Sequence, residues 1–147
     1  MLFVRTRKDM VMNNLTDCLT FLLAKAYQKA HGKFKKVLQT HGLTAVQHLV
    51  LEALWIEDGL TASEISKRLI LDNATLSGVL DRMVDAGWIV KRSDEEDRRY
   101  IRIYLSRKSI DMKGILIGVR DSVNKELLSG FTMEESILLK RLLRDIM

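Results

Sequence analysis

The sequence contains no proline, a single cysteine and no long apolar run. Proline interrupts helix interiors, so its absence fits long helices and argues against a loop-rich sandwich. Because Cys18 has no second cysteine to pair with, an intrachain disulfide is excluded, and a reducing cytoplasm is the expected compartment. Charges such as Glu52 break the apolar stretches, and none approaches the roughly 20 residues of a membrane helix. Residues 1–8 lack the apolar region of a secretory signal peptide.

The composition fits one compact domain of 147 residues. Hydrophobic residues make up 47% of the chain, enough for a core, and charged residues make up 29%. The formal net charge of +5 permits an anionic partner without requiring one. No Ser/His/Asp set, phosphate-cradling glycine loop or pair of carboxylates stands out, so we expect neither an enzyme nor a cofactor.

Apolar residues recur at helical spacing in the first third of the chain. They predict a helix from Asn14, its N-cap, to about His41. A second helix opens on the capping box of residues 44–47 and ends at Asp58 and Gly59.

Two short helices then follow at helix-turn-helix length. The first opens on the capping box of residues 61–64 and runs through Leu69, and the second is capped by Asp72 or Asn73. Gly87 stands where a left-handed C-cap residue belongs. The apolar face of the second helix is formed by Leu76, Val79, Leu80 and Met83.

After the helix-turn-helix, the spacing of the apolar residues changes from helical to alternating. Residues 88–92 are typical of a strand, residues 93–99 form a highly charged tip, and residues 100–105 alternate between apolar and polar. Two strands joined by a charged tip, directly after a helix-turn-helix, predict a wing. Beyond the wing, residues 106 to about 129 predict a long helix, and a capping box at residues 132–135 opens a last one.

The second short helix has small polar residues on its exposed side. Thr75 and Arg82 share one edge, and Ser77 lies on another. Small residues let a backbone approach a groove closely, and these side chains supply donors for base edges or phosphates. The alternative is a solvated face on which Arg82 pairs with Asp85. Asp81 counts against DNA contact, because it would repel phosphates.

The wing tip, residues 94–99, mixes both signs of charge. A guanidinium at a hairpin tip can enter a minor groove, whose narrow A·T-rich stretches carry enhanced negative potential. A carboxylate two residues earlier, as Asp97 stands to Arg99, can hold the guanidinium in one rotamer. An ordinary charged turn is the alternative, and it is the commoner fate of such runs.

Residues 97–99 (Asp-Arg-Arg) followed by residues 105–106 (Leu-Ser) resemble the wing motif of the MarR family. Residues 60–89 resemble the helix-turn-helix of the same family. The resemblance covers nearly the whole chain in element order and is specific between about residues 60 and 106. The family's members are dimeric regulators whose recognition helices enter the major groove and whose wing arginines enter the minor groove.

This resemblance implies a mainly α fold, a winged helix-turn-helix with a two-stranded wing and N- and C-terminal dimerisation helices. Within a single domain, 1–147, the DNA-reading part would span about 44–106 and the dimerisation helices about 14–41 and 107–147. Arg99 would be the wing arginine and Asp97 its orienting partner. The implied DNA-contacting residues are Asn73, Thr75, Ser77, Arg82, Asp97, Arg98 and Arg99.

The function so implied is a sequence-specific transcriptional regulator, a repressor, that binds double-stranded DNA as a homodimer on a pseudo-palindromic site. The outer helices suit a shared core independently, because they carry many large aliphatic side chains for a small domain: Leu15, Leu19, Leu22, Leu138, Leu142 and Ile146. An intrachain core is the alternative use of these side chains.

Two other functions stay open. One is a redox-sensing or small-ligand-sensing member of the same family. The other is a helical interaction module that does not bind DNA, which Asp81 and the acidic wing tip favour.

Sensing of organic hydroperoxides, known in one branch of the family, uses a cysteine early in the first helix. Aligning residues 21–23 with that branch places Thr20 at the position of the cysteine, and Cys18 lies about 200° round the helix from it. Phe34 stands where the branch has a tyrosine that activates the cysteine. The match therefore fails at two positions.

Small aromatic acids bind many relatives between the dimer helices and the reading head. By resemblance, Tyr27, His31 and Trp55 are candidates to line such a pocket for a small aromatic effector, and a place in the core or on the surface is the commoner alternative for each. The spacing of the histidines at 31, 41 and 48 does not place pairs on one helical turn, so we expect no metal site.

Overall fold

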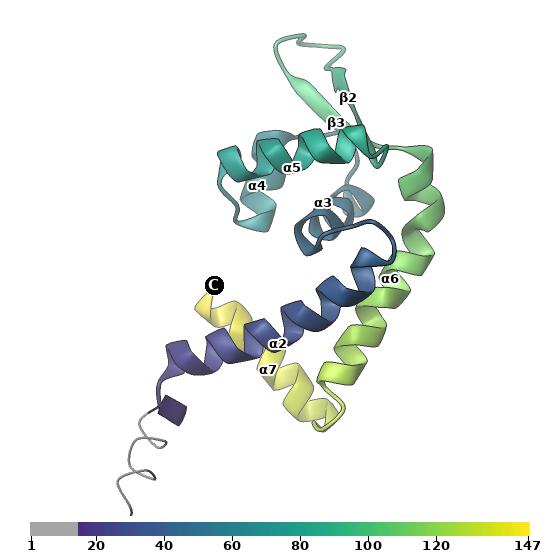
Figure 1. Cartoon of the computed structure of the whole chain (residues 1–147). Coiled ribbons are helices and arrows are strands. Elements are labelled where there is room, and N and C mark those ends of the chain that lie inside the picture. Colours follow the sequence, from purple (N-terminus) through teal and green to yellow (C-terminus); the bar gives the residue numbers. More distant parts are fainter. Residues whose placement is uncertain (1–14) are drawn as a thin grey trace, which may run out of the picture.

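The computed structural model describes residues 15–147 (Figure 1). Its elements, in chain order, are α2 (Leu19–Gln39), α3 (Ala45–Ile56), β1 (Leu60–Thr61), α4 (Ala62–Leu69), α5 (Asn73–Asp85), β2 (Ile89–Ser93), β3 (Ile101–Leu105), α6 (Arg107–Leu127) and α7 (Met133–Ile146). The mainly helical winged helix-turn-helix predicted from the sequence is confirmed. No helix within residues 15–147 is long and apolar enough to cross a membrane.

The elements form a reading head and a helical base (Figure 1). The head contains α3, α4, α5 and the sheet, and its wing extends away from the rest of the molecule. The long helix α6 leaves the foot of the wing and runs down to the base, where it packs against α2. Helix α7 follows α6 after a turn and, in the view of Figure 1, crosses α2. The order of elements therefore places the wing and the turn between α6 and α7 at opposite ends.

Local capping interactions set the start of most helices. The predicted capping boxes at Thr44, Thr61 and Thr132 are all present, each with the threonine hydroxyl accepting from the backbone three residues later. Asp72, of the two residues considered, is the N-cap of α5, and Gly87 takes the predicted left-handed conformation with φ of 75°. The contacts of Thr61, Asp72 and Gly87 fix where the helix-turn-helix formed by α4 and α5 begins and ends.

The first helix departs from the prediction. Asn14 and residues 1–8 lie outside the described residues, and the continuous helix does not start before Leu19. Cys18 is its N-cap, has extended backbone angles and makes no side-chain capping bond. Thr16, Asp17 and Cys18 all have low intrinsic helix propensity, which explains a break at this point.

The sheet contains one strand more than the two predicted wing strands. Its order is β1-β3-β2, with both pairs antiparallel. The β2–β3 hairpin is confirmed, with register from Ile89 opposite Leu105 to Ser93 opposite Ile101. Strand β1 pairs Leu60 with Ile103 and so attaches the wing to the start of α4.

The hydrophobic core lies in the reading head and continues into the base. Its largest fully buried side chains are Trp88, Leu38, Leu51, Leu54, Ile65, Leu76, Leu80, Met83, Ile89, Ile103 and Leu116. Burial of each large apolar side chain contributes roughly 1.5–3 kcal/mol. Since Leu38 lies on α2 and Leu116 on α6, this core also holds the head on its base.

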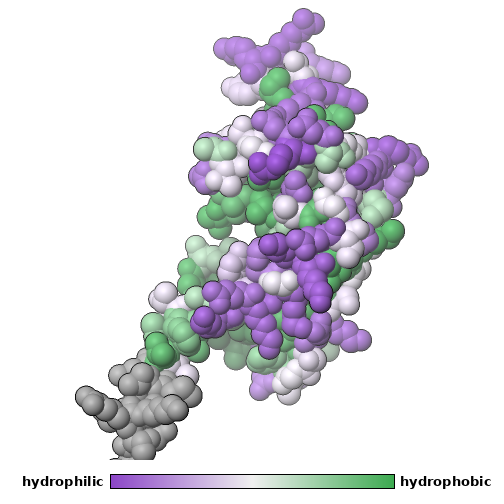
Figure 2. Space-filling model, viewed as in Figure 1, coloured by the Kyte–Doolittle hydropathy of each residue, from purple (hydrophilic) through white to green (hydrophobic). Residues whose placement is uncertain are grey.

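Helix α7 buries none of its residues within the described chain. Its apolar side chains Ile137, Leu138, Leu142 and Ile146 are all exposed, as are Leu15, Leu19 and Leu22 near the start of α2. Figure 2 shows apolar surface near the start of α2, in contrast to the wing, which is mainly hydrophilic. A single protomer therefore leaves a large apolar surface uncovered at its base.

Candidate nucleic-acid interface

Helix α5 presents the small polar face that its sequence predicts. Asn73, Thr75, Ser77 and Arg82 are exposed, and the opposite face is buried in the head. Gly78 lies between Thr75 and Arg82 along the helix, with the Arg82 guanidinium turned back toward it. The structure thus brings these candidate residues onto the solvent side of one rigid helix.

Asp72 organises the first turn of α5. One carboxylate oxygen accepts the backbone N–H of Thr75 at 2.7 Å, and the other lies 2.6 Å from the Thr75 hydroxyl. The hydrogen bonds from Thr75 hold the pKa of Asp72 below its ordinary value. The carboxylate is therefore ionised at neutral pH and acts only as an acceptor.

Asp81 does not stand as an isolated negative charge. Its carboxylate lies 2.6 Å from the ammonium of Lys91 on β2, and this pair connects α5 to the wing. The alternative pairing of Arg82 with Asp85 does not occur in the described part of the chain. Lys91 thus offsets the phosphate repulsion that Asp81 would otherwise exert.

At the wing tip, Asp97 holds Arg99 by side-chain hydrogen bonds from two nitrogens of the guanidinium. Its carboxylate accepts from Nε of Arg99 at 3.0 Å and from Nη2 at 2.7 Å, and it also accepts the Arg99 backbone N–H at 3.1 Å. These bonds lower the pKa of Asp97 and raise the pKa of Arg99. Because the Arg99 side chain is 85% exposed, its guanidinium is both oriented and accessible.

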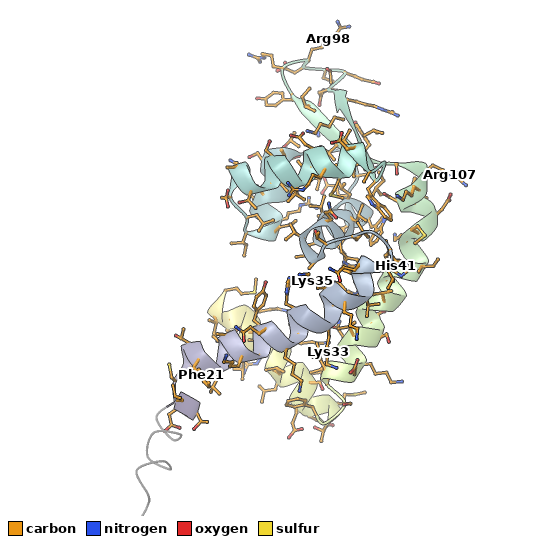
Figure 3. The ribbon with its side chains drawn as sticks, viewed as in Figure 1. Phe21, Lys33, Lys35, His41, Arg98 and Arg107 are labelled. Atoms are coloured by element: carbon orange, nitrogen blue, oxygen red, sulfur yellow. The ribbon has the colours of Figure 1, made fainter. Side chains whose placement is uncertain are left out.

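Arg98 projects from the far end of the wing, away from the head (Figure 3). In the sequence it stands between the two members of the oriented pair, Asp97 and Arg99. The structure thus places Asp97, Arg98 and Arg99, the three wing residues predicted from the sequence, at one end of the hairpin. Among the described contacts, Asp97 holds the side chain of Arg99 and not that of Arg98.

A second wing contact was not predicted from the sequence. The guanidinium of Arg102, on β3, bonds the carboxylate of Asp94 and donates from Nη1 to the carbonyl oxygen of Gly59 at 2.9 Å. Asp94 also accepts the backbone N–H groups of Glu96 and Asp97 at 2.8 and 3.1 Å. Bonds from Arg102 and the backbone lower the pKa of Asp94. Arg102 therefore ties the wing-tip loop to the body of the head.

The corner beneath the wing leaves no room for a side chain at Gly59. The residue has φ of 76°, and a Cβ there would lie 2.8 Å from the Tyr104 ring. The neighbouring Asp58 carboxylate accepts from the Leu105 backbone at 2.9 Å. The arginine–tyrosine contact of Arg92 over Tyr104, at 5.6 Å, covers the same ring. Position 59 thus requires glycine for both conformation and space.

A cavity of about 270 Å³ lies between α2, α3 and α6. Tyr27 and His31 line it, as predicted, and so do Phe34, Leu49 and Arg120. Trp55 does not line this cavity: it packs against the core, contacts the His48 ring, and its indole donates to the Ser109 carbonyl oxygen at 3.3 Å. The cavity is mainly apolar with a cationic side chain at its edge.

Cys18 is exposed and lies just before α2. The sequence placed it about 200° round the helix from Thr20, but a residue outside the helix has no such angular position. Phe34 packs edge-on against His48, with ring centroids 5.0 Å apart. It brings no hydroxyl toward a cysteine.

Three comparisons with known proteins cover different lengths of the chain. A model of the MarR family matches residues 41–99. The HTH-type transcriptional regulator TtmR of Methylorubrum extorquens is 35% identical over 112 residues, which are 74% of this chain and only 56% of that relative. The organic hydroperoxide resistance transcriptional regulator of Bacillus subtilis is 30% identical over 120 residues, 77% of this chain and 82% of the relative.

The fold is similar to solved structures over most of its length. A variant of MarR from E. coli, in complex with operator DNA, superposes with a TM-score of 0.81 at 25% sequence identity. The match covers 88% of this chain and 93% of the other. The similarity therefore extends beyond the reading head into the helices of the base.

Proposed function

Because the chain belongs to the MarR family of transcriptional regulators, we propose that it represses transcription as a homodimer bound to a pseudo-palindromic site in double-stranded DNA. Helix α5 of each protomer enters the major groove, and the wing enters the adjacent minor groove. The contacts come from the exposed residues of α5 and from the wing residues Asp97, Arg98 and Arg99.

The oriented guanidinium of Arg99 is the observation that carries this proposal. It is exposed at the end of a projecting hairpin, and Asp97 restricts its rotamers before any DNA arrives. A contact prepared in this way loses less side-chain entropy on binding. The related E. coli protein solved with operator DNA supports the same use of the fold.

The proposed homodimer would cover the apolar base. Helix α7 has no buried residue of its own, and exposed leucines continue onto α2. Two copies of this surface can form one core, which agrees with a division into a reading part, about 44–106, and dimerisation helices on both sides. We propose no catalytic role for the chain and place its action in the cytoplasm, where DNA is accessible.

Three of the acidic residues that favoured a module without DNA binding have a cationic partner. Asp81 pairs with Lys91, Asp94 with Arg102 and Asp97 with Arg99. Their negative charge therefore orients basic side chains, and this weakens the case for the interaction module.

Selection of duplexes from a random-sequence DNA pool tests the proposal. The full chain should enrich a site with two inverted half-sites about 10 base pairs apart, one helical turn between their centres. A reporter placed behind such a site should lose expression when the chain is present. Recovery of no enriched sequence at low salt would contradict the proposed function, because non-specific attraction alone gives no consensus.

The cavity supports a small aromatic acid as an effector. It has an apolar lining with Tyr27 and Phe34 for ring contacts, and the guanidinium of Arg120, which also bonds Glu52 and Asp121, lies at its edge as a cation for a carboxylate. BpsR of Bordetella bronchiseptica, a solved structure of similar fold, is regulated in its DNA binding by 6-hydroxynicotinic acid. Titration of benzoate and hydroxybenzoates into the protein–DNA complex should release DNA, and Phe34→Trp, which fills the cavity, should reduce that release.

A further inference from the structure

The direction of one hydrogen bond in α5 is fixed by the chemistry of its partners. The Thr75 hydroxyl lies 2.6 Å from Oδ2 of Asp72. An ionised carboxylate has no hydrogen to give, so the hydroxyl must donate. The Thr75 backbone N–H donates to the other carboxylate oxygen at 2.7 Å, and this second bond keeps the carboxylate in place.

A threonine hydroxyl has one hydrogen and two acceptor lone pairs. With the hydrogen directed at Asp72, only the lone pairs and the methyl group of the exposed Thr75 face solvent. In the major groove, hydrogen-bond donors come only from the N6 amine of adenine and the N4 amine of cytosine. Guanine and thymine present acceptors at the corresponding places, which an acceptor cannot bond.

We propose that Thr75 determines specificity by accepting a hydrogen bond from an adenine or cytosine amine, with Asp72 as the positioning residue that sets the direction of its hydroxyl. The inference rests on the proposed function, since it requires α5 to lie in the major groove. It goes beyond that function by naming the chemical group that one position of the site must present.

The same geometry argues against a phosphate as the partner of Thr75. Phosphate oxygens are acceptors, so a hydroxyl without a free hydrogen cannot bond them. Asp72 also places a negative charge at the start of α5 and accepts from the first-turn backbone that would otherwise bind an anion. The first turn of α5 is thereby left to base edges.

The substitution Asp72→Asn reverses the direction of the bond with little change in shape. Asparagine is as good an N-cap as aspartate, so its carbonyl oxygen can keep the backbone bond. Its amide nitrogen then faces the Thr75 oxygen and donates to it. The hydroxyl hydrogen is released toward the groove, where it can bond an acceptor on guanine or thymine.

The experiment compares duplexes selected from a random-sequence pool by four full-length proteins. The wild type should show adenine or cytosine at one symmetric position of the site. Asp72→Asn should shift that position to guanine or thymine, and Thr75→Val, which keeps the methyl contact, should lose the preference. Asp85→Asn is the control for charge, because it removes one carboxylate from the same helix and should leave every preference unchanged.

A duplex that lacks only the amine gives the quantitative test. Replacing the selected adenine by purine, or a selected cytosine by 2-pyrimidinone, should weaken wild-type binding roughly 2-fold to 12-fold per half-site. The same replacement should leave the affinity of Thr75→Val almost unchanged. The comparison of the two proteins removes any effect of the modified base on the duplex itself.

Two kinds of failure can be told apart. Absence of any consensus for the wild type would overturn the proposed function. A clear consensus that neither Thr75→Val nor Asp72→Asn alters would leave that function standing and overturn the role of Thr75. Full affinity of Thr75→Val for the unmodified site would show that the Thr75 hydroxyl contributes nothing to binding, which also contradicts amine recognition.

Discussion

Nδ1 of His48 lies 3.6 Å from Oε1 of Glu52, and among the described residues neither atom has a hydrogen-bond partner. The imidazole is completely buried, and its Nε2 lies 3.2 Å from the Leu116 carbonyl oxygen. A carbonyl only accepts, so Nε2 carries the hydrogen and the neutral ring leaves Nδ1 bare. The other carboxylate oxygen of Glu52 bonds Arg120 on α6 at 2.7 Å. These groups join α3 of the head to α6 of the base.

The free energy of unfolding should fall as the pH drops below about 6.5. Burial lowers the pKa of His48 from its ordinary value of 6.5, although the Leu116 carbonyl and Glu52 act in the opposite direction. The unfolded chain therefore binds a proton over a pH range in which the folded chain does not, and stability rises with pH there. Urea unfolding measured between about pH 5 and pH 7.5 should show this slope.

The slope should largely disappear in His48→Phe and persist in His41→Gln. The carboxylates with lowered pKa, such as Glu64, act in a separate range, since their stabilisation is lost only as the pH falls below about 4.5. An unchanged slope between about pH 5 and pH 7 in His48→Phe would contradict the assignment to this histidine.

Arg99→Ala should weaken operator binding strongly and leave folding almost unaltered. The side chain lies at a hairpin tip, where truncation removes little packing. Its proposed minor-groove contact occurs twice in a dimer, so we expect a loss of roughly thirtyfold or more. Affinities at one salt concentration should follow the order Arg98→Ala, Asp97→Ala, Arg99→Ala, from least to most affected. Equal damage from Arg98→Ala and Arg99→Ala would mean that only the net charge of the wing matters.

Arg102→Gln should reduce DNA affinity several-fold without any change in the state of association. The guanidinium of this arginine is used within the protein, where it bonds Asp94 of the tip loop and the Gly59 carbonyl oxygen. Its loss should free the loop, and amide hydrogen exchange at residues 94–100 should become faster. Arg107→Gln removes an equal charge from the start of α6 and should affect only the salt-dependent attraction. Unaltered exchange in Arg102→Gln would disprove the tether.

Removal of residues 131–147 should abolish the dimer. Helix α7 leaves its apolar side chains exposed in one protomer, so we expect the full chain to scatter light as a dimer at micromolar concentration. Leu142→Glu offers a milder test in case the truncated chain fails to fold, and Glu134→Gln on the polar face is its control. A well-folded monomer formed by the full chain would refute the proposed assembly.

Cys18→Ser should leave the response of DNA binding to organic hydroperoxide unchanged. Cys18 lies outside α2, and Phe34, at the position of an activating tyrosine, packs against His48. Gel-shift assays before and after treatment with cumene hydroperoxide measure the effect. Release of DNA by the oxidised wild type but not by the serine variant would restore Cys18 as a sensor.

Short-range signals account for what the sequence predicted correctly. Capping boxes join residues three apart, and Asp97 is two residues from Arg99, so the sequence alone brings these partners together. The face of α5 follows from helical periodicity within one element. Each of these predictions needed no knowledge of how distant segments pack.

Long-range pairing accounts for what the sequence did not reveal. Strand β1 is only two residues long, too short for a period, and it exists because Leu60 meets Ile103. The contact of Arg102 with Gly59 depends on that same pairing. Trp55 and His31 both lie on helices, and the sequence made both candidates for a pocket. His31 lines the cavity, whereas the packing of α3 on α6 directs Trp55 to the Ser109 carbonyl oxygen instead.

Because the apolar face of α7 finds no cover within its own protomer, mass action governs how much of the chain is ready to bind an operator. While most chains are separate, the concentration of the proposed dimer follows the square of the chain concentration. Halving the chain concentration then lowers the dimer concentration to about a quarter. Occupancy of a target promoter would therefore respond more steeply than protein synthesis itself, with no communication required between the two reading heads.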